Sequence, residues 1–267
     1  MNRGDISGLF RKLGLSRIAD DIRFRVMKFK HRDKNRQFKT AYPDVALPPD
    51  YLIYESFQMD YDKYYHGGKR TAAWLVGHFE QHKEPKNLSV LDWGCGPGRT
   101  IRHLPDLMPD GNKFYGTDVN RRSVAWCRKH IPRVDFRTNE LHPPLDFAAA
   151  QMDVVYAVSI ITHLSEDNQI KWLQEIKRVL RPGGIFLLTS HGEVFKTIMT
   201  QTERDRYERD EIVIRGNTTE GHRVYGAFHP PAKMRELFGR YFKILSHEPG
   251  KIVNGKPLQD VWVLVKE

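Results

Sequence analysis

The amino-acid sequence predicts an α/β protein with a parallel sheet that is covered by helices on both faces. From residue 88 onward, short apolar runs alternate with amphipathic segments, which is typical of strands joined by helices. A glycine-rich turn, Gly94–Gly98, lies between the first of these runs and the first long helix that we expect. The chain has 267 residues and 40% of them are hydrophobic, which is enough for a sizeable core.

The first 40 residues form a basic segment. They hold 12 Lys and Arg residues and four acidic residues, a net charge of +8, whereas the whole chain carries +10. The basic charge therefore belongs to this segment and is weak evidence that the main domain binds nucleic acid.

An apolar stripe runs through this segment, because Ile18, Ile22, Val26 and Phe29 are spaced as on one face of a helix. Three interpretations of residues 1–40 stay open. The helix can be solvated and packed on the domain, it can bind RNA, or it can lie on anionic lipid as a peripheral membrane contact.

A boundary follows the basic segment near residue 40, where two proline-containing stretches, 42–44 and 47–50, cannot continue a helix. An aromatic-rich stretch comes next and ends at His66-Gly67-Gly68, after which residues 71–81 are expected to form a helix. We therefore divide the chain into a basic, aromatic-rich N-terminal arm and cap (residues 1–70) and a main domain (residues 71–267).

After the helix at residues 71–81, the main domain continues with five predicted strands. The clearest helix covers residues 168–180 and stops at Pro182-Gly183-Gly184. A charged insert at about residues 192–231 follows the fifth strand and is a candidate substrate lid, because ligands bind at strand ends. A short helix (232–238) and two last strands (242–247 and 260–265) complete the domain. The five strands are predicted at residues 89–93, 113–117, 134–137, 153–158 and 185–189.

The glycine turn reads Gly-x-Gly-x-Gly from Gly94 to Gly98. Glycines let the backbone pass close to a ligand, and exposed amides at such a turn can meet a carboxylate. A dinucleotide fingerprint would be Gly-x-Gly-x-x-Gly, and Arg99 stands where its third glycine would fall. A nicotinamide cofactor is therefore disfavoured.

With this turn and four further blocks, residues 70–267 resemble the class I S-adenosylmethionine-dependent methyltransferases. The further blocks are Tyr115–Asn120, Asn139, Asp153–Ser159 and Arg178–Gly184, in the order and spacing of that family. The resemblance implies a Rossmann-like, seven-stranded, mostly parallel sheet with an antiparallel last strand, preceded by an N-terminal helical cap. It also implies the cofactor S-adenosyl-L-methionine and the product S-adenosyl-L-homocysteine.

The resemblance assigns cofactor roles to individual residues. The glycine loop corresponds to the part that holds the methionine moiety, Asp118 to the acid that accepts hydrogen bonds from both ribose hydroxyls, and Asn139 to the residue near the adenine amino group. A nicotinamide-dependent oxidoreductase and an inactive cofactor-binding module are the alternatives. The expected cofactor-binding residues are Asp92, Gly94, Cys95, Gly96, Gly98, Asp118, Val119, Asn139, Glu140 and Ser159.

The acceptor is expected to be a small molecule. Enzymes that methylate exocyclic base nitrogens carry an Asn/Asp-Pro-Pro-aromatic motif after the fourth strand, where this chain has Val158-Ser159-Ile160-Ile161. Neither Cys95 nor Cys127 lies in a late motif suited to covalent catalysis on pyrimidines. Later segments resemble bacterial methyltransferases of polysaccharide or glycolipid synthesis, which implies O-methylation of a hydroxyl. An RNA or protein methyltransferase is the alternative.

A hydroxyl acceptor must lose a proton, and histidine is the side chain best suited to accept it near neutral pH. The candidate bases are His191, at the end of the fifth strand, His163 and His229. His191-x-Glu193 offers two metal ligands without a third, so no metal is expected.

The two cysteines form no Cys-x-x-Cys pair, and the longest apolar runs are far too short to span a bilayer. These features predict a cytoplasmic protein, with peripheral contact at the inner membrane surface as the option left open. The sequence leaves the oligomeric state open.

Overall fold

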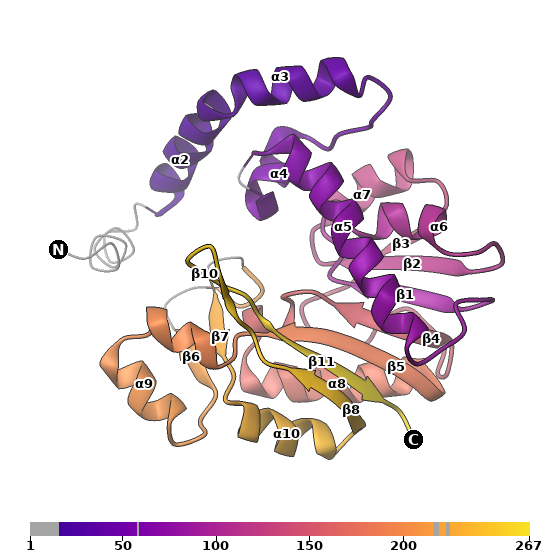
Figure 1. Ribbon diagram of the computed structural model, residues 1–267, viewed down its shortest axis with the longest axis vertical. Helices are drawn as coiled ribbons and strands as arrows, with labels where there is room; N and C mark the ends of the chain where they lie inside the picture. The colour runs from indigo at the N-terminus through magenta and orange to yellow at the C-terminus, as the bar shows by residue number, and fades with distance from the viewer. Residues whose placement is uncertain (1–15, 58, 216–218, 223–224) are drawn as a thin grey trace. The chain divides into compact units, whose positions relative to one another are not determined.

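A computed structural model describes residues 16–57, 59–215, 219–222 and 225–267, and it divides the chain into two compact units (Figure 1). The first unit ends at Arg70 and the second runs from Thr71 to Glu267, so the division falls within one helix, α5. No described helix combines the length and apolar composition that a bilayer span requires. The helices that begin in the first unit are α2 (Ser16–Lys30), α3 (Arg32–Ala41), α4 (Asp50–Phe57) and α5 (Tyr61–Glu80).

The second unit is built on the predicted seven-stranded sheet, in the order β3-β2-β1-β4-β5-β11-β8. Neighbours from β3 to β5 are parallel, whereas β11 is antiparallel to both β5 and β8. The predicted fold class and the antiparallel last strand are therefore confirmed. The strands are β1 (Ser89–Trp93), β2 (Lys113–Asp118), β3 (Asp135–Thr138), β4 (Met152–Ala157), β5 (Leu180–Ser190), β8 (Lys243–Glu248) and β11 (Asp260–Val265).

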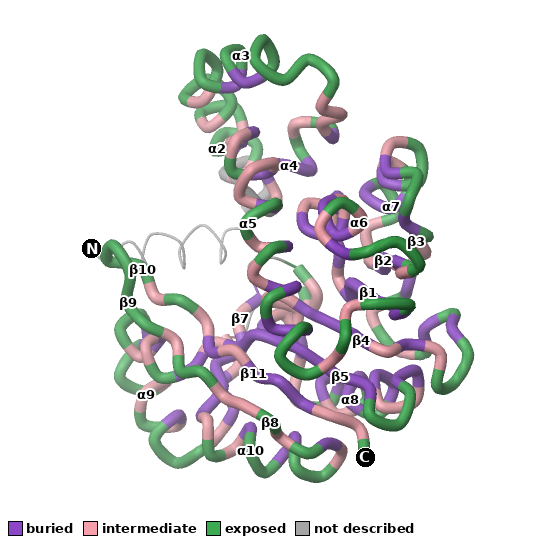
Figure 2. The backbone as a smooth tube through the Cα atoms, turned by 45° about the vertical axis from the view of Figure 1, so that its right-hand side comes forward, coloured by how far each residue is buried: buried purple, intermediate pink, exposed green. Residues whose placement is uncertain are grey.

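Helices cover both faces of this sheet. Successive side chains of each strand point to opposite faces, so they alternate between two buried clusters. Leu91 faces the cluster formed with α8 (Glu166–Val179) and α10 (Pro231–Gly239), and Val90 faces the cluster formed with residues 72–79 of α5 and with α7 (Arg121–His130). Figure 2 shows the buried residues running along the central strands, with exposed residues on the outer faces of the helices. The core therefore lies on both sides of β1, β4 and β5.

Helix α8 shows why these segments are helical. The Ser165 hydroxyl accepts a hydrogen bond from Asn168 N at 3.3 Å and caps the first turn. Acidic residues lie in that turn and basic residues in the last, which complements the helix dipole. The helix therefore begins two residues before the predicted start.

Two predicted helices differ from the structure. Helix α5 begins at Tyr61, ten residues before the predicted start, because buried contacts of Tyr61 and Tyr64 stabilise a helix that runs through Gly67 and Gly68. After the glycine loop, the predicted long helix is replaced by a 3₁₀ turn, η1 (Ile101–His103), and a four-residue helix, α6 (Leu104–Leu107). Pro105 supplies no backbone N–H at that point, and Pro109 follows shortly.

The insert after β5 folds around a small core of its own. Its apolar cluster includes Phe195, Tyr207 and Phe228, and a capping box at Thr200 begins its helix. Its elements are η3 (Glu193–Ile198), α9 (Gln201–Tyr207), β6 (Val213–Arg215) and β7 (Gly226–Phe228), and the hairpin β9 (Ile252–Val253) and β10 (Lys256–Pro257) follows β8.

Candidate active site at the carboxyl ends of the strands

The glycine loop that follows β1 is held against the next strand. Thr117 O accepts hydrogen bonds from Gly94 N and Cys95 N, at 2.8 and 2.9 Å. Gly94, Gly96 and Gly98 have φ angles of +84°, +52° and +72°, which strain any residue with a Cβ atom. A Cβ atom at Gly94 would lie 2.1 Å from Ile160 Cδ1, whereas one at Gly96 would meet open space. The loop is therefore tightly packed at its start and open in its middle.

Asp118 ends β2 beside this loop. Its Oδ2 accepts a hydrogen bond from Gly96 N and its Oδ1 accepts one from Asn120 N, both at 2.7 Å. Burial raises the pKa of this carboxyl, and the two backbone bonds oppose the rise. Since a carboxylate accepts about four hydrogen bonds, Asp118 keeps capacity for two hydroxyls. The exposed apolar side chain of Val119 lies next in sequence.

Asn139 follows β3 and contacts the end of β2, because its backbone N–H donates to Asp118 O at 3.2 Å. Its side-chain Nδ2 donates to Glu140 O at 2.7 Å, while its Oδ1 is buried and has no hydrogen-bond partner among the described residues. An unsatisfied buried acceptor costs about 1–3 kcal/mol. An exocyclic amine of a bound base would satisfy it.

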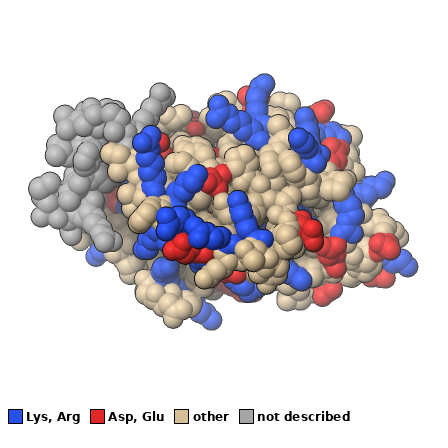
Figure 3. Space-filling model, turned by 90° about the horizontal axis from the view of Figure 1, so that it is seen from above, with Lys and Arg blue, Asp and Glu red and all other residues tan. Residues whose placement is uncertain are grey.

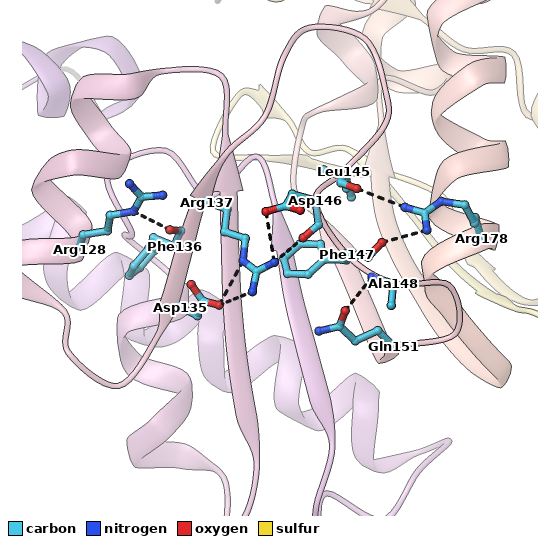
Figure 4. A network of polar contacts seen from close by, with 10 residues as sticks. All are labelled: Arg128, Asp135, Phe136, Arg137, Leu145, Asp146, Phe147, Ala148, Gln151 and Arg178. Carbon is cyan, nitrogen blue, oxygen red and sulfur yellow. Dashed lines mark hydrogen bonds and ion pairs between the residues drawn. The ribbon is translucent and has the colours of Figure 1, made fainter.

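The loop that begins with Asn139 is fixed by arginines (Figure 4). Arg137 donates to Asp146 O and pairs with Asp135 at 2.8 Å. Arg178 of α8 donates to Phe147 O and Leu145 O, at 2.9 and 3.2 Å. The connection between β3 and β4 is therefore held rigidly at one edge of the site.

Asp92 of β1 is buried, and its Oδ2 accepts a hydrogen bond from the Tyr156 hydroxyl at 2.8 Å. Burial raises the pKa of Asp92 to about 7, and the charge of Asp118 adds to the rise. Asp92 therefore joins β1 to β4 beneath the glycine loop.

Ser159, just after β4, has a φ of +65°. Its N–H donates to Thr189 Oγ1 and its Oγ accepts from Gln259 Nε2, both at 2.8 Å. Thr189 in turn donates to Gln259 Oε1. This network fixes a strained residue between β4, β5 and the start of β11.

Two of the three histidines singled out from the sequence, His163 and His191, bond to one short segment of the insert, residues 225–229, and the third, His229, lies in that segment. His163 Nδ1 bonds to Tyr225 O at 2.9 Å, His191 Nδ1 to Ala227 O at 3.0 Å, and the backbone N–H of His229 to His191 O at 2.8 Å. Because a carbonyl only accepts, Nδ1 of His163 and of His191 carries the proton, and Nε2 of each ring keeps its lone pair.

Burial lowers the pKa of His163, and it lowers that of His191 to about 4. His229 is completely buried, its pKa is lowered to about 3 by burial and by His191, and its Nε2 faces the Gln169 amide at 3.2 Å. All three rings are therefore neutral near pH 7.

Gln169 and Tyr207 belong to this constellation, and sequence reasoning missed both. Tyr207 donates its hydroxyl hydrogen to His229 O at 3.0 Å. Gln169 lies on α8 and Tyr207 on α9, so only the fold brings them to the histidines, and no local motif signals it. Among the described residues, no group of three or more His, Cys, Asp or Glu side chains could hold a metal ion.

Comparisons with known proteins agree with this geometry. Residues 90–184 match the model of the methyltransferase domain family. The chain is 37% identical over 106 residues to a probable S-adenosylmethionine-dependent methyltransferase of Mycolicibacterium smegmatis, a match that covers 39% of this chain and 38% of that protein. It is 25% identical over 182 residues to a tRNA N(3)-methylcytidine methyltransferase of Schizosaccharomyces pombe, covering 63% and 56%. The matched regions thus span only part of these relatives.

One similar solved structure is the magnesium protoporphyrin IX methyltransferase of Synechocystis PCC 6803 with bound SAH. It has a TM-score of 0.55 and 15% identity, and the match covers 91% of this chain and 98% of that one. At this identity the likeness shows a shared fold.

Proposed function

We propose that this S-adenosylmethionine-dependent methyltransferase transfers a methyl group to a hydroxyl oxygen of a small acceptor, such as a sugar or a glycolipid. The family match at residues 90–184 supports the methyl transfer. Bound S-adenosylmethionine would supply an electrophilic methyl group on a positively charged sulfur. The protein's own tasks are to align the acceptor, to exclude water and to take up the hydroxyl proton.

The residues at the strand ends fit this cofactor. The Oδ1 of Asn139, which has no partner among the described residues, suits the adenine amino group, and Asp118 keeps acceptor capacity for the ribose hydroxyls. The open space at Gly96 lets a ligand approach the backbone. In this proposal Val119 packs beside the adenine, Glu140 contributes its backbone, and Cys95, Gly94, Gly98, Asp92 and Ser159 shape the loop.

The proposal of a hydroxyl acceptor depends on the protonation state of the His191 ring. Its Nδ1–H is committed to Ala227 O, so Nε2 is the basic nitrogen of a ring that is neutral at physiological pH. His191 follows β5 directly, at the edge where acceptors bind in such sheets. We assign His191 as the general base, His163 as its neighbour on the acceptor side, and the buried His229 as a positioning residue.

The insert supports a small acceptor, because it lies against the histidines. Gly221 N donates to His163 O at 2.9 Å, and Glu220 accepts from the backbone and the hydroxyl of Ser165 at 2.7 and 2.8 Å. A segment held in this way can cover a small substrate and exclude water. With a lipid-linked acceptor, the location we propose is the cytoplasm, peripheral at the inner face of the membrane.

The test uses methyl-labelled S-adenosylmethionine and an extract of the source cells. Label in the glycan, lipid or soluble-metabolite fraction is the expected result. Label in the RNA or protein fraction would overturn the small-acceptor proposal, and the similarity to a tRNA methyltransferase makes RNA the first fraction to count. Failure to bind S-adenosylmethionine in a titration would contradict the activity as a whole.

A further inference from the structure

Helix α2 of the first unit has two apolar faces. Phe24 and Met27 pack against the buried cluster of that unit, and the Phe24 ring lies 5.5 Å from Tyr51 and 5.3 Å from Tyr54. These contacts attach α2 to its unit together with an ion pair between Lys28 and Asp50 at 2.8 Å.

The other face is exposed. Ile22, Val26 and Phe29 have exposed fractions of 57%, 58% and 74%. They follow each other at intervals of four and three residues, so they form one stripe, and at 3.6 residues per turn this stripe lies on the side of α2 away from Met27. We call these three residues the outer stripe. Three large apolar side chains side by side in water are unusual unless something covers them.

Basic residues flank the outer stripe. Residues 16–41 hold nine Lys and Arg residues and three acidic ones. At 100° per residue, Arg25 lies on one side of the stripe and Lys30 and Arg23 on the other. Among the described residues, Arg23 and Lys30 form no ion pair, and both are exposed. Lys and Arg side chains are prominent on the face of the molecule seen in Figure 3.

The acidic residues of the same segment are already engaged. Asp21 pairs with Arg25 at 3.0 Å, Asp33 pairs with Arg32 at 3.3 Å, and Asp20 accepts a hydrogen bond from the Tyr54 hydroxyl at 2.7 Å. The surface around the outer stripe is therefore apolar at its centre and positively charged on the side of Arg23 and Lys30, whereas Arg25 on the other side is paired with Asp21.

We propose that α2 lies on an anionic lipid surface, with Ile22, Val26 and Phe29 among the acyl chains and Arg23 and Lys30 at the headgroup phosphates. An apolar centre with cationic margins is the pattern of an interfacial helix. An RNA partner would leave the apolar stripe without a complement. A second copy of the chain would bring two strongly basic helices together. The inference deepens the proposed function, because it names the surface that would bring the enzyme to a lipid-linked acceptor.

The test is flotation of the full chain with phosphatidylcholine vesicles and with vesicles that also contain phosphatidylglycerol. The native chain should float only with the anionic vesicles, and added salt should release it. Ile22→Ser/Val26→Ser/Phe29→Ser should lower binding at least about tenfold, because it removes the inserted apolar surface. Arg23→Gln and Lys30→Gln should each lower it about fivefold at low salt.

Because all the substituted side chains are exposed, the variants should keep the native circular dichroism and melting temperature. Ile252→Ser/Val253→Ser is the matched control, since it removes two exposed apolar side chains (55% and 45%) from the β9 strand of the second unit. It should bind vesicles as the native chain does.

Each of these results would overturn the inference: equal binding to both kinds of vesicle, unchanged binding of the outer-stripe variant, or a dimer that dissociates in this variant without any flotation. Tighter binding to RNA than to vesicles, unaffected by the stripe substitutions, would do the same. Titration of S-adenosylmethionine into each variant separates the two proposals. A protein that floats without binding the cofactor contradicts only the proposed function.

Discussion

The carboxylate of Asp118 accepts a hydrogen bond from the backbone N–H of Gly96 at 2.7 Å, which joins the end of β2 to the middle of the glycine loop. The loop and the acid therefore form one structural unit, although 22 residues separate them. A side chain with this position both shapes the loop and presents acceptor atoms to a ligand.

Substitution Asp118→Ala should weaken binding of S-adenosylmethionine about 10- to 100-fold, because hydrogen bonds to a charged group contribute about 1.5–3 kcal/mol. Isothermal titration calorimetry measures the affinity directly. Asp106→Ala is a suitable control, since that carboxylate is exposed and pairs only with Arg133 among the described residues. Undiminished affinity in Asp118→Ala would contradict the assignment of this acid to the cofactor.

Asp92 makes the stability of the fold depend on pH. Its pKa is raised to about 7, so between about pH 4 and pH 7 the folded state binds more protons than the unfolded state. The contribution of Asp92 to stability is thus complete below about pH 4 and is lost as the pH rises through 7. Asp92→Asn stays neutral and can still accept the Tyr156 hydroxyl hydrogen.

We therefore compare the unfolding free energy of Asp92→Asn with that of the native chain. This difference should rise in favour of Asp92→Asn by on the order of 2–4 kcal/mol between about pH 4 and pH 8. Urea unfolding at both pH values measures the difference. His191 and His229 have lowered pKa values and give the opposite slope, but they are present in both proteins and cancel. A constant difference across the range would show that Asp92 is ionised in the folded state.

Much of this architecture could be predicted from the sequence, because strand alternation and the Gly94–Gly98 turn are local signals. The assignment of Asp118 and Asn139 to strand ends follows from the same pattern. Local signals did not predict the bounds of two helices. Helix α5 runs through a glycine pair because Tyr61 and Tyr64 are buried, and Pro105 interrupts the long helix expected after the glycine loop.

The histidine constellation shows a second kind of limit. The sequence indicates His163, His191 and His229 separately, but only the folded insert brings residues 225–229, which include His229, to the rings of His163 and His191. The periodicity likewise groups Ile22, Val26 and Phe29 on one face of α2, but it does not tell which face packs against the rest of the first unit. In the structure Phe24 and Met27 lie on the packed face, since they contact Tyr51, Tyr54 and the rest of the cluster.

His191→Ala should lower kcat about 100-fold or more and leave the affinity for S-adenosylmethionine unchanged, as expected for the loss of a general base. Because burial lowers the pKa of His191 to about 4, kcat/KM of the native enzyme should stay constant as the pH falls from about 8 to about 5. Steady-state rates with the identified acceptor check both points, and the exposed His82→Ala serves as control. Unchanged turnover in His191→Ala would remove this residue as the base.

Substitution of Gly94 tests whether the conformation of the glycine loop requires a residue without a Cβ atom. A residue with a Cβ atom at its φ of +84° is strained by about 1–2 kcal/mol, and the new atom would lie 2.1 Å from Ile160 Cδ1. Gly94→Ala should therefore reduce the unfolding free energy by several kcal/mol and abolish cofactor binding.

Two further variants separate these causes. Gly96→Ala meets no atom within 4 Å, so it should show only the cost of its φ of +52°. Gly77 is exposed in the last turn of α5 with open space around it, so Gly77→Ala should stabilise the chain by up to about 1 kcal/mol. If the clash at Gly94 is real, Gly94→Ala combined with Ile160→Ala should cost less than the sum of the two single changes, because the shortened side chain makes room for the new methyl group. Strict additivity of the unfolding free energies would show that Ile160 does not limit the loop.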